Sequence, residues 1–451
     1  MMQVYSKNFA MERVLRKAVN EAMKFSFFNR LIKYPLLRYS FDMKIWIKYL
    51  IGIVLGIATA ILLPFDGDFS KNLLNFFYEF AIRFGRYTIL PVIVFGVSTA
   101  VFKLRVSKKV LPVGFLLVVV LLVTTAALTL LGLISTLIIQ LPRIPIPTGT
   151  ESDIPGISFS QLLFRLLPFS SFDSLLEDAF LLPAFLFASL AGAGCATDIN
   201  DSKHAVNVLE SFSKVAYNVM SFFVDTLSIG MMAITCYWFI DARAVLLEGS
   251  FTPLIIMLTA NLVLVLFVIY PVAIHFLCRG AHPFKILYAS VCPITTAFFS
   301  GDTNVTLPVA LKHGRESFGI NRYVSDVIYP VFSVFARGGT ALVTTICFVV
   351  ILRSYSSLSI SFTDVMWIAS VAFGLSFLLG EIPMGGSFMV LTIMCVMYGR
   401  GFEAGYLLLK PMAALMGAFS AAIDAGTMMF GSYFVAQKMK AVENYELKNF
   451  I

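Results

Sequence analysis

Charged residues are scarce in this sequence, and their scarcity excludes the class of soluble globular domains. Only 13% of the 451 residues are charged and 59% are hydrophobic, and the mean hydropathy is +0.86. Soluble domains carry about 25% charged residues. The net charge of +8 would suggest a nucleic-acid partner in a soluble protein. In so apolar a chain it indicates membrane topology instead, and no nucleic acid is expected.

Catalytic and metal-binding patterns are also missing. The six cysteines form no CxxC pair and lie mostly within apolar runs, so they are interpreted as small apolar side chains. No nucleophile stands beside a base, no metal-ligand cluster occurs, and no phosphate-binding loop follows a strand. We therefore expect no enzyme and no metal or cofactor site.

Long apolar runs are what the chain has in abundance. Runs of about 20 apolar residues are long enough to span a bilayer core. No small-residue cleavage site follows the first run, so the runs are predicted to be spanning helices and not a signal peptide. The prediction is an all-α, multi-pass membrane protein with runs at Trp46–Leu63, Val110–Leu141, Phe251–Cys278, Tyr323–Leu352 and Val365–Met397.

Basic residues gather in short segments between the runs, and such segments are predicted to be cytoplasmic. They are Lys103–Lys109, Arg279–Lys285, Lys312–Arg322 and Lys438–Lys440. Both termini, including the tail at 441–451, are then cytoplasmic. The basic segment 1–42 has two open interpretations, an amphipathic helix lying on anionic lipid or a solvated tail.

Two segments in the second half carry a polar tip between apolar arms that are too short to span. The tips are Ser300–Asn304 and Gly380–Gly386, and both segments are predicted to be re-entrant hairpins. Non-helical backbone is tolerated at membrane depth only when it is buried in protein or lines a cavity. Two such tips therefore predict an inverted repeat around a midplane substrate site. Ordinary glycine-rich helix packing is the alternative.

Four motifs together resemble a known family. "AFFSGDTNVTLPVALKHG", "YPVFSVFARGGTAL", "LLGEIPMGGSFMVL" and "AIDAGTMMFGS" are similar, in this order, to the first hairpin, seventh helix, second hairpin and eighth helix of the dicarboxylate/amino acid:cation symporters, the glutamate transporter family. The resemblance implies eight transmembrane helices plus two hairpins with inverted repeats. It also implies a plasma-membrane homotrimer that carries its substrate by an elevator movement.

The resemblance also implies a division of the chain into two functional parts. Scaffold helices 1–2 are expected at 43–108 and helices 4–5 at 161–243. The transport domain comprises helix 3 at 109–141 and residues 251–440. Within 251–440, hairpin 1 is expected at about 284–316, helix 7 at about 322–352, hairpin 2 at about 366–400 and helix 8 at about 403–438.

Several substrate-binding positions follow from the same resemblance. Asp424 matches the aspartate that holds a substrate amino group, and a lone carboxylate at membrane depth is costly unless it meets a cation. Thr427 and Met428 lie on the same face of that helix. The other implied positions are in the two hairpin tips: Asp302, Thr303 and Asn304 in the first, and Ile382, Pro383, Gly385 and Gly386 in the second.

The sequence departs from the family at its cation sites. The signature Asn-Met-Asp-Gly-Thr is here Ala336 to Thr340, "ARGGT", so the asparagine and aspartate that bind sodium are gone. Thr124, Thr125 and Thr340 are the remaining cation-site positions, and hydroxyls alone do not replace the carboxylates that a hard cation prefers. Members that carry acidic substrates usually have arginine where Thr427 stands.

Arg337 itself requires a partner, because a charged side chain at the centre of a membrane helix costs about 2.5 to 3.5 kcal/mol. Three roles are open. In the first, the guanidinium of Arg337 occupies the place of a sodium ion, and transport is independent of sodium or coupled to protons through Glu381 or Asp302. In the second, Arg337 binds a substrate carboxylate with its bidentate fork. In the third, Arg337 forms a structural ion pair with Asp424.

We expect a symporter of a small carboxylate-bearing solute, an amino acid or a dicarboxylate, with membrane lipid as its surroundings. An anion-conducting channel or a non-transporting sensor that kept the fold is the alternative. Saturable counterflow of one solute would distinguish a carrier from a channel.

Overall fold

Helices make up the regular structure of the protein. The computed structural model describes residues 44–63, 67–145, 181–278, 281–355, 361–379, 386–443 and 450–451. Within these ranges the only β-type pairing is an isolated bridge between Ile320 and Val442. Seven helical segments there are long and apolar enough to cross a membrane. The predicted all-α, multi-pass architecture is confirmed in this part of the chain, which holds seven candidate spans where eight helices were expected.

Six helices form the first half of the described chain. They are α4 (Ile45–Leu62), α5 (Asp68–Arg86), α6 (Ile89–Val106), α7 (Val110–Ile138), α10 (Leu182–Cys195) and α11 (Ile199–Glu248). The longest, α11, has 50 residues and so extends about 75 Å at 1.5 Å per residue. It begins at the cap Asp198, whose carboxylate accepts from the amides of Asn200 and Asp201, and ends at Gly249 with φ of 73°.

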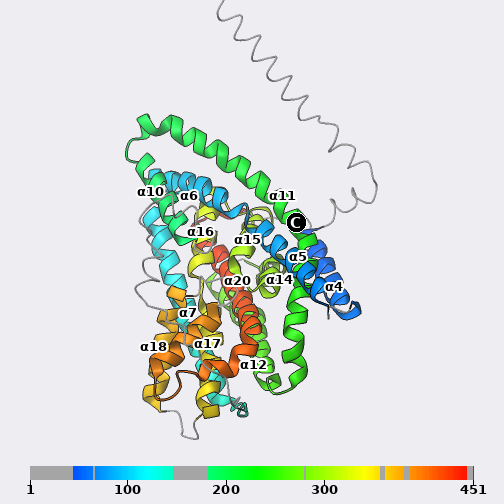
Figure 1. The fold of residues 1–451 in the computed structure, drawn as a ribbon. Coiled ribbons are helices and arrows are strands. Elements are labelled where there is room, and N and C mark those ends of the chain that lie inside the picture. The colour runs from blue at the N-terminus through cyan, green and yellow to red at the C-terminus, as the bar shows by residue number, and fades with distance from the viewer. Residues whose placement is uncertain are drawn as a thin grey trace, which may run out of the picture. The chain divides into compact units, whose positions relative to one another are not determined.

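The second half is built from shorter helices. They are α12 (Thr252–Val263), the π-helix η1 (Leu264–Ile269), α13 (Tyr270–Leu277), α14 (Pro283–Ser300), α15 (Thr303–Glu316), α16 (Arg322–Phe335), α17 (Gly338–Tyr355), α18 (Phe362–Leu379), α19 (Gly386–Tyr398), the 3₁₀-helix η2 (Gly405–Met412) and α20 (Ala413–Lys438). Figure 1 shows α20 running past α14 and α15, and both of them pack against it.

The turn between α14 and α15 lies within the first predicted hairpin tip. Gly301 adopts a φ of 63°, in the left-handed region that favours glycine. Asp302 follows with extended backbone and caps α15, because its carboxylate accepts a hydrogen bond from the amide of Asn304. A glycine followed by an aspartate therefore ends one helix and starts the next.

A second interruption separates α16 from α17 at Ala336 and Arg337, so the segment expected as helix 7 consists of two helices in line. Both lie in the apolar segment Arg322–Tyr355, in which 94% of an 18-residue stretch is buried. The break is thus enclosed by protein, which is the situation in which non-helical backbone is stable at membrane depth.

The break lies against α20 at very short range. A Cβ atom on Gly339 would lie 2.5 Å from the carbonyl oxygen of Ser420 and 3.0 Å from the amide nitrogen of Asp424. Only a glycine allows this approach, because any side chain at this position would overlap the backbone of α20. The contact places the first turn of α17 next to Asp424.

Helix α5 packs on α11 through aromatic side chains. Tyr78 stacks on Tyr237 with ring centroids 4.1 Å apart, and Phe84 stacks on Phe223 at 4.2 Å. Such pairs contribute about 0.5 to 1.5 kcal/mol each beyond the area that they bury. Helices α5 and α11 therefore form one packed group.

Candidate functional site

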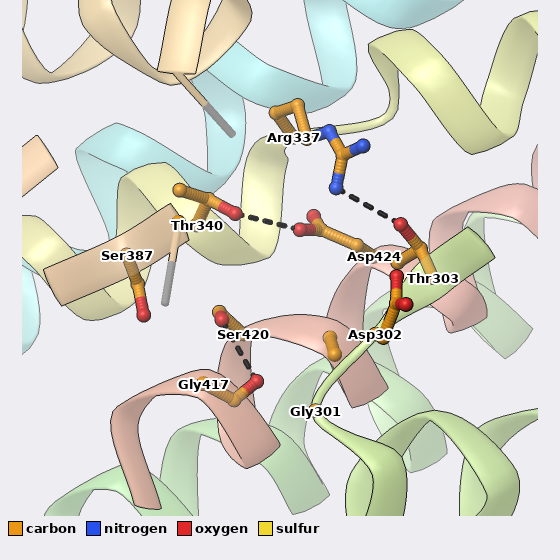
Figure 2. Close-up of a pocket in the computed structure, with 11 residues that line it drawn as sticks. Gly301, Asp302, Thr303, Arg337, Thr340, Ser387, Gly417, Ser420 and Asp424 are labelled. Carbon is orange, nitrogen blue, oxygen red and sulfur yellow. Dashed lines mark hydrogen bonds between the residues drawn. The ribbon is translucent and has the colours of Figure 1, made fainter. Parts of the chain in front are cut away.

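A polar pocket lies where the α14–α15 turn, the α16–α17 break, the start of α19 and the first half of α20 meet. The empty space among its lining residues is about 280 Å³, including the part open to the outside. The lining residues are Gly301, Asp302, Thr303, Arg337, Thr340, Gly386, Ser387, Gly417, Ser420, Ala421 and Asp424. Figure 2 shows Arg337, Thr303, Asp424 and Thr340 gathered on one side of it, with Ser387 and Ser420 on the other. Six residues predicted from the sequence thus line one pocket: Asp302, Thr303, Arg337, Thr340, Gly386 and Asp424.

Arg337 is held by the end of the helix that precedes it. Its side chain is buried, with 3% of the residue exposed. Its Nε and Nη2 donate to the carbonyl oxygens of Val334 and Ser333 at 2.9 and 2.8 Å. These carbonyls lie at the C-terminal end of α16, where the helix dipole favours a cation. Nη1 donates to Thr303 Oγ1 at 3.0 Å, which joins the break to the hairpin tip (Figure 2).

Asp424 binds the other side of the break. Its Oδ1 accepts from the amide of Gly339 at 2.6 Å and its Oδ2 accepts from Thr340 Oγ1 at 2.8 Å. The carboxylate therefore sits at the N-terminal end of α17, where the dipole favours an anion. Among the described residues Arg337 forms no ion pair with Asp424 or another acid. Arg337 binds the C-terminal end of α16 and Asp424 binds the N-terminal end of α17.

Asp302 has a partner that the sequence did not suggest. Its Oδ2 lies 3.0 Å from Nη2 of Arg86, the last residue of α5. Arg86 is within the apolar segment Asp68–Val106, a part of the chain interpreted above as scaffold. The rule that singled out Arg337, a charge inside an apolar span, would also have found Arg86.

The N-terminal ends of three helices meet at the pocket. Thr303 begins α15, Thr340 lies in the first turn of α17, and Gly386 begins α19. Helix N-termini carry partial positive charge and unpaired amides, which together favour an anionic group. Asp302 already caps α15 and Asp424 already binds the start of α17. The start of α19 and Arg337 are therefore left to receive an anion, and Asp424 to receive a cation.

Two predicted residues of α20 do not line the pocket. Thr427 is buried and its hydroxyl hydrogen-bonds to the hydroxyl of Tyr270, at the start of α13 directly after the π-helix. Met428 is also buried. The prediction that these two side chains form pocket walls is not supported by the pocket lining.

The remaining predicted residues have other positions. Asn304 is buried behind the tip and its Oδ1 accepts from Ser333 Oγ at 3.3 Å. Thr124 donates within its own helix to Val120. The hydroxyl of Thr125 is buried without a hydrogen-bond partner. Glu381, Ile382, Pro383 and Gly385 lie outside the described residues.

Ser387 and Ser420 line the pocket but were not predicted. Ser387 Oγ is buried and has no hydrogen-bond partner among the described residues, and Ser420 Oγ donates to Gly417 of its own helix. Serine is common in helix packing, so a lone serine carries little signal in the sequence. Ser387 directly follows the predicted second tip, and that position was the available signal.

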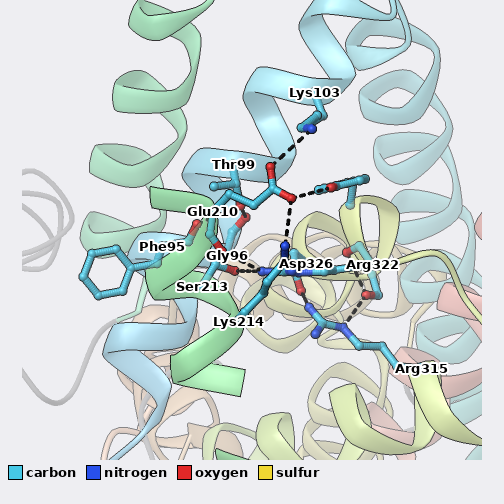
Figure 3. A network of polar contacts seen from close by, with 12 residues as sticks. Phe95, Gly96, Thr99, Lys103, Glu210, Ser213, Lys214, Arg315, Arg322 and Asp326 are labelled. Carbon is cyan, nitrogen blue, oxygen red and sulfur yellow. Dashed lines mark hydrogen bonds and ion pairs between the residues drawn. The ribbon is translucent and has the colours of Figure 1, made fainter. Parts of the chain in front are cut away.

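A polar network joins α6 and α11 to the start of α16, as Figure 3 shows. Glu210 of α11 pairs with Lys103 at 3.3 Å and accepts from the hydroxyl of Tyr323 at 3.2 Å. Asp326 accepts from Arg315 and lies 3.8 Å from Arg322. Arg322 and Asp326 lie one helical turn apart, and their contact is the longer of the two. Basic residues from segments far apart in the sequence, Lys103 and the pair Arg315 and Arg322, therefore lie close together.

A helical bundle with several candidate spans and a buried, charged pocket between two interrupted helical elements defines a multi-pass membrane transport protein, and not an enzyme. Interrupted helices around a midplane pocket are the arrangement by which secondary transporters hold small solutes. Comparison of the sequence with family profiles gives the family: the chain belongs to the sodium:dicarboxylate symporter family, whose profile matches residues 45–438.

Curated relatives agree. The serine/threonine transporter SstT of Acinetobacter baumannii is 25% identical over 367 residues, which is 79% of this chain and 86% of that protein. The human neutral amino acid transporter B(0) is 29% identical over 124 residues, 28% of this chain, and the rat protein is 28% identical over the same length. The match covers about a fifth (22%) of those mammalian proteins. Since these relatives are transporters, the channel and sensor alternative is not favoured.

Proposed function

We propose that the protein transports a small neutral amino acid across the plasma membrane, and that its uptake does not depend on sodium. The observation that carries the proposal is the pocket itself. The N-terminal end of α19 and the buried Arg337 favour a carboxylate on one side, and Asp424 favours an ammonium group on the other. An amino acid carries both groups on neighbouring atoms.

The charges around the pocket support a zwitterion over a dicarboxylate. Asp302 and Asp424 line the pocket with Arg337, and Arg86 pairs with Asp302 from outside it. Two negative and two positive charges cancel, so a solute with no net charge leaves the buried site neutral. A dicarboxylate would add two uncompensated negative charges at membrane depth, which is costly. The names of the relatives, neutral amino acid and serine/threonine transporters, point to the same substrate class.

Arg337 supports the absence of sodium coupling. In interrupted transporter helices, free carbonyls at the C-terminal end of a half-helix coordinate the coupling cation. Here the carbonyls of Ser333 and Val334 accept from Arg337. An arginine has five N–H donors and three are used in these bonds and the one to Thr303. Two N–H groups remain for a substrate carboxylate. Arg337 can therefore occupy the carbonyls at which a coupling cation would bind and hold the substrate at the same time.

Further features follow from family membership and belong to the same proposal. They are the homotrimer, the elevator movement and the location in the plasma membrane. Cytoplasmic termini are supported by the clustering of Lys103, Arg315 and Arg322 near one end. Residues 441–443 pair with 319–321 beside that cluster. A proton gradient acting through Glu381 or Asp302 is the alternative driving force.

The test is counterflow in proteoliposomes that contain the purified protein. Vesicles are loaded with unlabelled L-serine, and entry of labelled L-serine is followed with sodium, with a proton gradient, or with neither. We expect saturable counterflow that is the same in sodium and in choline. L-Aspartate and succinate should compete poorly. Strict dependence on sodium would contradict the role given to Arg337, and the absence of counterflow for any neutral amino acid would refute the proposed substrate class.

A further inference from the structure

The contact between Arg86 and Asp302 joins two parts of the molecule. Arg86 belongs to α5, which stacks on α11 through Tyr78 and Phe84. Asp302 belongs to the hairpin whose tip lines the pocket. The approach is close on either side of the pair, because a Cβ on Gly85 would lie 3.0 Å from Val305. The tip of the hairpin thus rests against the end of α5.

Asp302 serves the pocket and the contact at the same time. Its Oδ1 accepts from the amide of Asn304 at 2.8 Å and so caps α15. Its Oδ2 lies 3.0 Å from Arg86 Nη2, and the side chains of Arg86 and Asp302 are 23% and 2% exposed. Because Asp302 also lines the pocket, a cationic group bound there would share this carboxylate with Arg86.

The ion pair is close but poorly aligned. Within the part of the chain that the structure describes, neither Arg86 Nη2 nor Asp302 Oδ2 has a hydrogen-bond partner, although the two atoms are 3.0 Å apart, and Arg86 Nε also has none. The attraction is therefore electrostatic, without the directional bond that would add to it. Such a pair resists separation through charge alone, and a second cation near Asp302 weakens it.

The rest of the hairpin also meets α11 through polar contacts. Lys312 pairs with Asp225 at 3.0 Å, and Glu316 accepts from the hydroxyl of Tyr217 at 2.7 Å. Polar contacts of this kind are typical of interfaces that separate and re-form, whereas permanent interfaces are more apolar. The α15 arm of the hairpin thus meets α11 through groups that water can replace, whereas the α14 arm meets it through Trp238 against Phe298 and Phe299.

We infer that Arg86 is a positioning residue that holds the hairpin tip against α5 while the pocket is empty, and that the ammonium group of a bound amino acid, held by Asp424 in the same pocket, releases the tip by weakening the attraction between Asp302 and Arg86. The inference rests on the proposed function, since it requires the hairpin to move relative to α5 during transport. Its consequence is that the loaded protein moves more readily than the empty one. Exchange of one amino acid for another is then faster than net transport.

The experiment compares net efflux with exchange in proteoliposomes, using labelled L-serine as the probe. Vesicles loaded with labelled L-serine are diluted into buffer without amino acid, which measures net efflux, or into buffer with unlabelled L-serine, which measures exchange. The variants are Arg86→Met, Arg86→Gln and Arg86→Lys. The control is Arg83→Met, which removes an arginine of the same helix whose side chain is 81% exposed and pairs with Glu79.

In Arg86→Met the ratio of net efflux to exchange should rise about tenfold, which corresponds to about 1.4 kcal/mol removed from the barrier of the empty protein. Arg86→Gln should change the ratio in the same direction, and it replaces Arg86→Met in the comparison if the methionine variant does not fold. Arg86→Lys keeps the cation and should stay within about twofold of the wild-type ratio, as should Arg83→Met. A purely structural role of Arg86 would lower both rates together and leave the ratio unchanged.

An unchanged ratio in folded Arg86→Met or Arg86→Gln would overturn the inference while leaving the proposed function intact. A rise in Arg83→Met equal to that in Arg86→Met would also overturn it, because the effect would then be one of charge on α5 in general. Absence of counterflow in the wild-type protein would overturn the proposed function, and the inference with it.

Discussion

Replacing Arg337 by methionine should abolish transport, and the structure allows the size of the effect to be worked out. Arg337 gives three hydrogen bonds from a charged donor, to Ser333, Val334 and Thr303, and two N–H groups remain for the substrate. A hydrogen bond to a charged group contributes about 1.5 to 3 kcal/mol. Two such bonds to a carboxylate therefore correspond to a loss of about 10² to 10⁴ in kcat/KM.

The fold should survive the same change at a lower stability. Three charged hydrogen bonds are lost, but the cost of keeping a charge at membrane depth, about 2.5 to 3.5 kcal/mol, is lost too. The net destabilisation should be a few kcal/mol, visible as a lower melting temperature of the detergent-solubilised protein. Sodium should raise the melting temperature of Arg337→Met more than that of the wild type, because the carbonyls of Ser333 and Val334 become available to a cation.

The assay is initial counterflow of labelled L-serine at several concentrations, with melting curves in sodium chloride and choline chloride. Arg337→Lys should retain a small part of the activity, since one ammonium group cannot reproduce the planar fork. Arg353→Met is the matched control, because Arg353 lies at the far end of α17 and does not line the pocket. Counterflow in Arg337→Met equal to that in Arg353→Met would refute the reasoning.

Three further changes test the surroundings of the pocket. Asp424→Asn should lower kcat/KM for L-serine by about 10- to 100-fold, as expected for one charged hydrogen bond, with little change in melting temperature, because the new amide oxygen can still accept from Gly339; unaltered counterflow would contradict the ammonium role. Gly339→Ala should destabilise the protein by about 1 to 3 kcal/mol, since the new Cβ would lie 2.5 Å from the carbonyl of Ser420; an unchanged melting temperature would show that α17 and α20 can separate at no cost. Tyr270→Phe removes one buried hydrogen bond to Thr427 and should cost about 1 kcal/mol of stability while leaving counterflow within about twofold; a shift in preference among amino acids would place Thr427 in contact with substrate after all.

Local signals in the sequence account for the elements that build the pocket. Gly301 and Asp302 were recognised as part of a tip because polar residues stand there between apolar arms too short to span. Arg337 was singled out because a charge is costly inside an apolar helix. These features depend on neighbours in the chain, so they can be seen before any folding is considered.

Contacts between distant segments could not be obtained in the same way. Arg86 and Asp302 are separated by more than two hundred positions, and no sequence feature near either residue identifies the other as its partner. The two hydroxyls of Tyr270 and Thr427 meet only because a π-helix shifts the register of the chain just before Tyr270. The role expected for Thr427 came from the family pattern of α20 alone, and that pattern contains no information about the residue packed against it.

The burial of Arg337 in the α16–α17 break has a consequence for the energetics of transport. A sodium ion that crosses with a substrate is left on the other side, and the membrane potential then does about 2.3 kcal/mol of work per charge for each 100 mV. A guanidinium that is part of the chain returns with the protein at every turnover and leaves no charge behind. Under the proposed function, a carrier that relies on it to move a zwitterion transfers no net charge per turnover, so the membrane voltage does not drive its net uptake.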